Sequence, residues 1–251
     1  MIHRLFCSLV GLFLMVGFAM DSSAQAKPLR ALLITGGCCH NYPFQTQQLT
    51  NAVAKLSAVA WTVVMEGGSG TQAEISLYDN PDWAQGFDVV VHNECFADTT
   101  NRTYIRKITS AHKAGVPAVV IHCAMHTYRS TDIDDWREFL GVTSRRHDHQ
   151  GKYPVKLVAP ENPILKGVAA NWVTAMDELY VIEKLWPTAK ALATSVSEQD
   201  GKTYPVAWIN QYGQARVFGT TYGHSDEAWR DPDFLTLVSR GTLWAAGRLD
   251  N

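Results

Sequence analysis

Four short apolar runs in the sequence each lead to a histidine. The histidines are His40, His92, His122 and His224, and the runs before them are rich in Val, Ile and Leu. Continuous apolar runs of this length predict strands of a parallel sheet that is covered on both faces. Such sheets bind their ligands beyond the carboxyl ends of the strands. We therefore expect the histidines to meet at one edge of the sheet and to form a functional pocket there.

The residues at this predicted edge could bind a metal ion. Imidazole is the commonest metal-binding side chain in proteins, and carboxylates can complete the coordination of zinc. His40, His122 and His224 are the predicted ligands of a divalent ion such as zinc, with Glu94 or Glu178 nearby. For any single histidine, the alternative is a hydrogen-bonded residue of the core or rim.

The same side chains could transfer protons without a metal. Imidazole and carboxylate groups act as general acids and bases near neutral pH, and sugar carbons and hydroxyls are suitable substrates. His122, His224 and Glu178 are the predicted catalytic residues of such a site. The residues expected to bind the substrate are His40, Glu94, His126 and Tyr222.

Strands and helices alternate in the first half of the sequence. The predicted strands are residues 29–35, 60–65, 88–92 and 118–122, and the predicted helices are residues 42–56 and 101–114. In the second helix, Ile105, Ile108 and Ala111 recur at three-residue steps, and Gly115 follows its last residue. The alternation predicts right-handed crossovers and a doubly wound, mainly parallel α/β sheet flanked by helices.

The middle of the sequence, residues 145–208, favours shorter strands. They are predicted at residues 154–158, 179–183 and 189–196, followed by a hairpin of residues 207–209 and 216–221 and a closing helix at residues 233–248. His147 and His149 lie two residues apart. On a strand they would share one side and could cover the pocket, and a solvated loop is the alternative. We expect a single domain with an added β-rich middle segment.

The first 26 residues have the pattern of a secretory signal peptide. Arg4 precedes an apolar run from Leu5 to Met20, and Ala24-Gln25-Ala26 is a small-x-small cleavage site. The apolar run is shorter than the roughly 20 residues that span a membrane, so an uncleaved anchor is the less favoured alternative. We expect export to the periplasm or the exterior, with residues 27–251 as the mature domain and no stable membrane span.

The net charge limits the possible binding partners, and the cysteine content limits the possible disulfides. The net charge is −2 and no basic stripe is present, so nucleic-acid binding is not expected. Cys7 lies in the predicted signal, and the other cysteines are Cys38, Cys39, Cys95 and Cys123. An oxidising compartment permits disulfides, and adjacent strand ends could bring Cys38 or Cys39 close to Cys95. The pairing stays open, as does assembly into a homo-oligomer.

An ordered set of motifs resembles the ThuA-like (trehalose utilisation) family. The matching segments are residues 32–36 with His40, 120–124, 162–164 with Gly167, 177–180, 216–224 and 241–245. One departure is Asn162, where the family usually has a histidine. The resemblance implies a fold related to class I glutamine amidotransferases, of the flavodoxin-like kind. It also implies a role in the use of sugars such as trehalose and their oxidised keto forms.

The resemblance to amidotransferases implies a further chemistry. Those enzymes carry a nucleophilic cysteine on a tight turn after a strand, and a later histidine followed two residues on by a carboxylate. Cys123, His224 and Asp226 occupy the corresponding places. A thiolate at Cys123 would need His224 as its base. However, Cys123 lacks the glycines of a nucleophile elbow, and a buried unreactive cysteine is the alternative.

The sequence as a whole predicts an exported protein that acts on a small-molecule carbohydrate or its keto derivative through a His/carboxylate pocket. Hydrolysis, isomerisation and elimination would use the same groups, so the type of reaction stays open. A non-catalytic sugar-binding or accessory module is one alternative, and a Cys123-dependent amidase or hydrolase is another. A shared fold does not decide between them.

Overall fold

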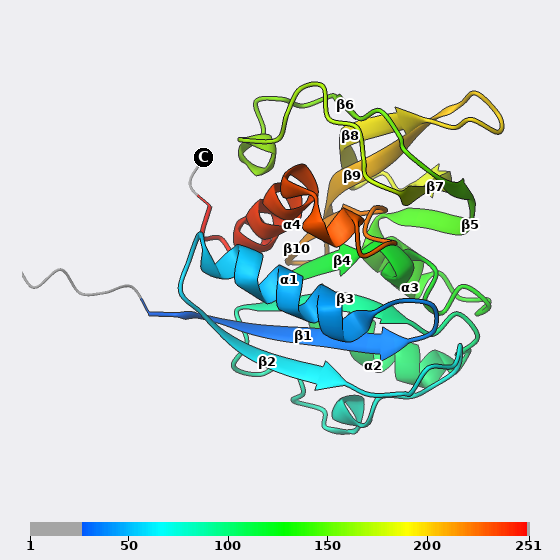
Figure 1. The fold of residues 1–251 in the computed structure, drawn as a ribbon. Coiled ribbons are helices and arrows are strands. Elements are labelled where there is room, and N and C mark those ends of the chain that lie inside the picture. Colours follow the sequence, from blue (N-terminus) through cyan, green and yellow to red (C-terminus); the bar gives the residue numbers. More distant parts are fainter. Residues whose placement is uncertain (1–26, 250–251) are drawn as a thin grey trace, which may run out of the picture.

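The computed structural model describes residues 27–249 of the chain. The predicted signal peptide, residues 1–26, lies outside the described residues. Within the described part, no helix has the length and apolar character that a membrane crossing needs. The chain folds around an eight-stranded sheet, and the strands of the middle segment extend one side of it (Figure 1).

The main sheet has the strand order β2-β1-β3-β4-β10-β9-β8-β6. From β2 to β10 the neighbouring strands are parallel, and from β10 to β6 they are antiparallel. These strands are β1 (Leu29–Gly37), β2 (Val59–Met65), β3 (Val89–Cys95), β4 (Ala118–Ile121), β6 (Lys156–Leu157), β8 (Ala189–Val196), β9 (Thr203–Tyr212) and β10 (Ala215–Thr220). The parallel half has the flavodoxin-like order, which reverses between β1 and β3. The predicted α/β fold is confirmed.

Helices cover both faces of this sheet. On one face, α1 (Tyr42–Ala54) packs beside α4 (Pro232–Ala245), and on the other α2 (Arg102–Lys113) packs beside the short α3 (Asp135–Leu140) (Figure 1). The side chain of Asn101 caps α2 by accepting hydrogen bonds from the backbone N–H groups of residues 103 and 104. Ile105 and Ile108 are buried, as their spacing predicts. The sequence pattern did not indicate α3.

The middle segment forms a separate two-stranded sheet over the pocket edge. Its strands are β5 (Val142–Gly151) and β7 (Asp177–Leu185), which pair antiparallel with several register shifts. β7 and β8 confirm two predicted strands, whereas the predicted strand at residues 154–158 shortens to β6. β5 was not predicted. It carries His147 to the pocket, and β7 carries Glu178.

One predicted strand end is wrong. Strand β3 continues past His92 to Cys95, so His92 lies inside the strand and not at the pocket edge. His92 and Glu94 are both fully buried, and His92 Nδ1 lies 2.8 Å from Glu94 Oε1. His92 Nε2 lies 3.0 Å from Nε2 of His112 on α2. The strand can therefore bury these polar residues because they are paired with each other and with the helix.

Candidate functional site

Three of the predicted histidines meet at the carboxyl edge of the parallel strands. His40 follows β1, His122 follows β4, and His224 follows β10. One ring nitrogen from each of them lies within 4.8 Å of the other two. The structure brings these residues together as the strand pattern led us to expect. Their role as metal ligands stays a prediction.

His122 is held in one orientation. Its backbone has a φ of +45°, which turns the chain sharply at the end of β4. Its Nδ1 donates to the carbonyl oxygen of Thr221 at 2.6 Å, which places the lone pair on Nε2. The hydroxyl of Tyr180 donates to this Nε2 at 3.3 Å. Burial keeps the pKa of His122 well below its usual value, so the ring is neutral.

His40 has no hydrogen-bond partner on either ring nitrogen, although both nitrogens are buried. Burial, and next the proximity of His224, lower its pKa to about 4. A buried polar group without a partner is costly, so such a ring is best explained by a ligand that it contacts in the functional state. His40 therefore offers a neutral, unused lone pair to the site.

Glu178 stands at the centre of the histidines. Its Oε2 lies 3.7 Å from His122 Nε2, 3.7 Å from His147 Nε2 and 3.4 Å from His224 Nδ1. Burial opposes its ionisation, but the contact with His224 outweighs burial and lowers the pKa of Glu178. By the same contact Glu178 raises the pKa of His224 against the effect of burial. The site thus contains a carboxylate that is ionised at neutral pH.

The neighbouring carboxylate, Asp177, was missed by sequence reasoning as an individual residue. It accepts hydrogen bonds from the backbone N–H groups of Glu178, Gly223 and His224. Burial raises its pKa to about 7 despite these bonds. Asp177 joins β7 to the loop after β10, and so it positions both Glu178 and His224. Only its place beside Glu178 in the family-like motif could have singled it out.

His40, Glu178 and His224 line a cavity of about 260 Å³, whereas His122 and Asp177 are buried and are not among its lining residues. Its walls are formed by Cys38, Cys39, His40, Thr71, Cys95, Ala97, Cys123, His126, Arg129, His147, Glu178, Tyr180 and His224. His126 was predicted to contact the substrate; it lies on this wall, stacked on Tyr180 with ring centroids 4.0 Å apart. His147 also reaches the cavity, whereas His149 is exposed and contacts Glu198. Arg129 and Thr71 were not anticipated.

Four predicted residues do not line the cavity, and the buried His122 is one of them. Glu94 is fully buried, pairs with His92 and is not among the residues that line the cavity, so the prediction that it binds substrate is wrong. Tyr222 is also buried, and its hydroxyl donates to Ser195. Asp226 accepts a hydrogen bond from Asn41 at 3.1 Å. The carboxylate paired with His224 is Glu178, because β7 crosses the end of the sheet above that histidine.

Cys123 does line the cavity, but it is not a thiol. Its Sγ is bonded to Sγ of Cys95, and Cys38 is bonded to Cys39. A disulfide sulfur cannot act as a thiolate nucleophile. The predicted nucleophile is therefore wrong for this disulfide form. The expected proximity of Cys38 to Cys95 is confirmed, since their Sγ atoms lie 3.7 Å apart.

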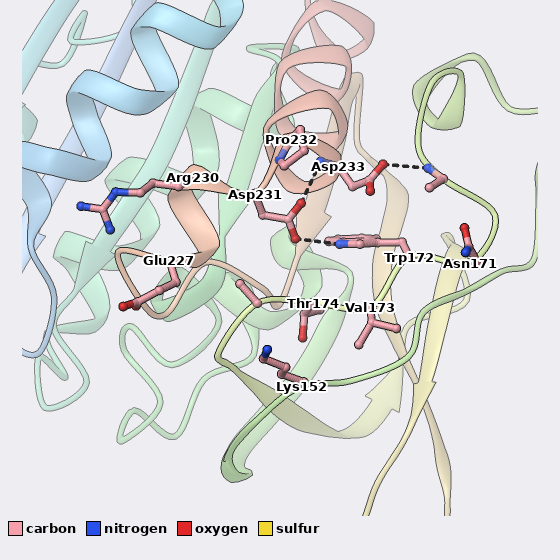
Figure 2. Close-up of a pocket in the computed structure, with 12 residues that line it drawn as sticks. Lys152, Asn171, Trp172, Val173, Thr174, Glu227, Arg230, Asp231, Pro232 and Asp233 are labelled. Atoms are coloured by element: carbon pink, nitrogen blue, oxygen red, sulfur yellow. Dashed lines mark hydrogen bonds between the residues drawn. The ribbon is translucent and has the colours of Figure 1, made fainter.

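A larger hollow of about 540 Å³ lies beside the start of α4 (Figure 2). Three of its polar side chains, those of Trp172, Asp231 and Asp233, are already hydrogen-bonded within the protein. Trp172 Nε1 donates to Asp231 at 2.8 Å, and Asp233 accepts from the backbone N–H of Ala169 at 2.7 Å (Figure 2). It brings together no cluster of partnerless titratable groups. The smaller, histidine-lined cavity is the stronger candidate because it gathers titratable side chains, including His40, whose ring nitrogens have no protein partner.

Comparison with known proteins agrees with the fold and the order of these motifs. A family model described as trehalose utilisation (ThuA) matches residues 38–245. A ThuA-like protein from Parabacteroides merdae has a similar structure, with a TM-score of 0.72, 21% identity, and coverage of 90% of this chain and 92% of that chain. A ThuA-like protein from Bacteroides uniformis gives a TM-score of 0.66, 16% identity, and coverage of 88% and 93%.

More distant structures share the fold alone. A GMP synthase subunit from Thermoplasma acidophilum has a TM-score of 0.55 at 11% identity, covering 88% of this chain and 95% of that chain. The curated proteins contain no match to the sequence. The family model covers most of the described residues, including all three converging histidines and Glu178. The chain belongs to the ThuA, or trehalose utilisation, family.

Proposed function

We propose that the protein is an enzyme that binds a divalent metal ion through His40, His122 and His224 and abstracts a proton from a keto sugar with Glu178. The observation that carries the proposal is the convergence of His40, His122 and His224, with Glu178 Oε2 3.7 Å from His122 and 3.4 Å from His224. Family membership supports a carbohydrate as the substrate.

Residues 1–26 support export, and N-terminal sequencing of the exported protein should find a start near Lys27.

The three histidines are of the residue type that binds metal ions, and two of them are in the neutral state that a metal ion needs. His40 and His122 are neutral at pH 7, and metal ions bind the neutral ring. The hydrogen bond from His122 Nδ1 to Thr221 is the kind of outer contact that orients a metal-binding histidine through its other nitrogen. One nitrogen of each ring lies within 4.8 Å of the other two, so these three residues would hold a zinc ion if their rings moved closer together.

The remaining groups suit proton transfer. A carbon next to a ketone loses its proton readily when the carbonyl oxygen is polarised, which is what a bound divalent ion supplies. Glu178 is ionised and can accept that proton, and the carboxylic acid that it becomes can return the proton to carbon or oxygen. Isomerisation and elimination both begin with this abstraction of a proton.

The size of the cavity suits a small sugar. Its volume of about 260 Å³ lies below the roughly 300–1,000 Å³ of drug-sized sites, and so it fits one sugar ring.

Metal content tests the first part of the proposal. We expect elemental analysis of the purified protein to find a divalent metal in stoichiometric amount and His122→Ala to lose it. His149→Ala is the matched control, because His149 is exposed and lies outside the cavity. Circular dichroism checks that each variant is folded. Absence of metal from the wild type, after incubation with Zn²⁺ and dialysis, would remove the metal from the proposal.

Proton abstraction tests the second part. In D₂O, the wild type should exchange the proton next to the carbonyl of a keto form of trehalose, as followed by NMR. Glu178→Gln should slow this exchange by about 10²-fold or more, since it removes the base. Glu183→Gln is the matched control, because Glu183 lies on the same strand but pairs with Arg145 at the surface. Binding of the sugar without exchange would instead identify a non-catalytic sugar-binding module.

A further inference from the structure

The cavity contains a second group of reactive atoms, the sulfur cluster, defined as Cys38, Cys39, Cys95 and Cys123. All four line the cavity beside the histidines. They form two disulfides, Cys38–Cys39 and Cys95–Cys123. They come from three separate places in the sequence, and the proposed carbohydrate chemistry uses neither disulfide.

The two disulfides are in contact. Cys38 Sγ lies 3.7 Å from Cys95 Sγ. The backbone holds this contact in place, since the N–H of Cys38 donates to the carbonyl oxygen of Cys95 at 3.4 Å. Gly37 permits the close approach, because a Cβ at that position would lie 2.2 Å from the same oxygen. Cys38 is therefore fixed where its sulfur can reach the second disulfide.

The disulfides differ in their access to solvent. Cys39 is exposed and Cys38 is half-buried. Cys95 and Cys123 are only 3% and 6% exposed. Thiol–disulfide exchange requires the attacking sulfur to reach the disulfide directly. A reductant in solution can therefore reach Cys39, while the buried disulfide is reached through Cys38.

We propose that the sulfur cluster is a thiol–disulfide exchange site in which a dithiol reduces the Cys38–Cys39 disulfide at Cys39 and the Cys38 thiol then exchanges with the Cys95–Cys123 disulfide. In the first step the dithiol attacks Cys39, the Cys38–Cys39 bond breaks, and the dithiol leaves as its own disulfide. Cys38 and Cys39 are then thiols, holding the two electrons and two protons that the dithiol lost.

In the second step the Cys38 thiolate attacks Cys95. The Cys38–Cys95 bond forms, the Cys95–Cys123 bond breaks, and Cys123 leaves as a thiolate that takes up the proton given up by Cys38. The product has one disulfide, Cys38–Cys95, and two thiols, Cys39 and Cys123. The overall change therefore delivers a thiol to the buried wall of the cavity. This inference is independent of the proposed carbohydrate chemistry.

A matched pair of variants separates the roles of the two adjacent cysteines. Cys39→Ser leaves Cys38 as the free thiol, and Cys38→Ser leaves Cys39. Each full-length variant is alkylated at low pH, digested with trypsin and mapped by mass spectrometry. Cys38, Cys95 and Cys123 fall in different tryptic peptides, residues 31–55, 56–102 and 114–129, and Cys7 falls in residues 5–30.

In Cys39→Ser we expect the Cys95–Cys123 link to be lost, with residues 31–55 joined to residues 56–102 and Cys123 alkylated. In Cys38→Ser we expect the Cys95–Cys123 link to persist, with Cys39 alkylated. If the Cys95–Cys123 link persists in both variants, or is lost in both, the exchange through Cys38 does not occur and the proposal is overturned.

The wild type gives a test that does not depend on the variants' folding. One molar equivalent of dithiothreitol, which carries two electrons, is added to the oxidised protein before alkylation. We expect alkylation of Cys39 and Cys123 and a new link between Cys38 and Cys95. Alkylation of Cys38 and Cys39 together, with Cys95–Cys123 intact, would overturn the proposal, as would a purified protein with neither disulfide.

Discussion

His40 and His224 face each other across the site with ring centroids 5.0 Å apart, yet their pKa values move in opposite directions. Both rings lose hydration on folding. His224 gains the Glu178 carboxylate, whose Oε2 lies 3.4 Å from its Nδ1, and this contact raises its pKa against the effect of burial. His40 has no such partner, so burial lowers its pKa to about 4. The contact with one carboxylate therefore moves the pKa values of two neighbouring imidazoles apart.

His126 allows a residue-scale prediction about acid stability. Burial lowers its pKa from 6.5 to about 3 in the folded protein. Between these values the unfolded chain binds more protons than the folded chain, so stability falls as the pH falls below 6.5. From pH 7 to pH 5 this one group costs about 2 kcal/mol of unfolding free energy. In His126→Gln that contribution is absent.

Urea unfolding of both proteins at pH 7 and pH 5 measures this difference. The wild type should lose about 2 kcal/mol more than His126→Gln on acidification. Asp177, whose pKa is raised to about 7, changes stability in the opposite direction, but it is present in both proteins and cancels. Equal losses in the two proteins would show that His126 is protonated in the folded state at pH 5.

At the scale of elements, two glycines let the layers approach. A Cβ at Gly219 on β10 would lie 2.4 Å from the Trp208 ring of β9. A Cβ at Gly241 on α4 would lie 2.2 Å from the ring of Phe218 on β10. The loop that carries His224 connects β10 to α4, so this packing also sets where that histidine lies.

Gly241→Ala should destabilise the protein although alanine is the better helix former. The helical preference favours alanine by about 1 kcal/mol. The collision with Phe218 costs roughly 1–3 kcal/mol, because the core must shift to admit the methyl group. We expect a net loss in urea unfolding. Gly70→Ala is the control, since nothing closer than 4.0 Å meets its Cβ, and an equal effect of both substitutions would contradict this packing argument.

At the scale of the whole molecule, the site exists only when distant segments are assembled. His40 follows β1, His122 follows β4 and His224 follows β10. These strands belong to one sheet, in which β3 lies between β1 and β4, and β10 is the neighbour of β4. Glu178 arrives from the second sheet, on β7. An ion bound by all three histidines would bind the folded chain and not the unfolded chain. Metal binding should therefore raise the stability of the entire domain.

Thermal unfolding with and without Zn²⁺ tests this coupling. At a free concentration 100 times its Kd, a ligand specific to the folded state adds about 2.7 kcal/mol. For a domain of this size that corresponds to a rise in Tm of roughly 5–10 °C. His40→Ala should lose the rise, whereas His149→Ala should keep it. A rise of the same size in His40→Ala would place the ion elsewhere.

The amino-acid sequence alone determined the alternating elements and the edge where the site lies. Local periodicity, caps and turns predict β1, α1, α2, β8 and α4 to within a few residues, because these signals act between near neighbours along the chain. The order of strands then places His40, His122 and His224 at one edge. The short α3 and the irregular β5 escaped prediction because packing, and not a clear local pattern, stabilises them.

Only the tertiary structure decided which polar residues are free to act. Glu94 looked as available as Glu178 in the sequence, yet folding pairs it with His92 in the core. Cys123 looked like a nucleophile until folding brought Cys95 to it. The physical reason is that hydrogen bonds, disulfides and burial depend on partners that are distant in the sequence. A residue's chemistry follows from those partners, and the sequence pattern near it cannot name them.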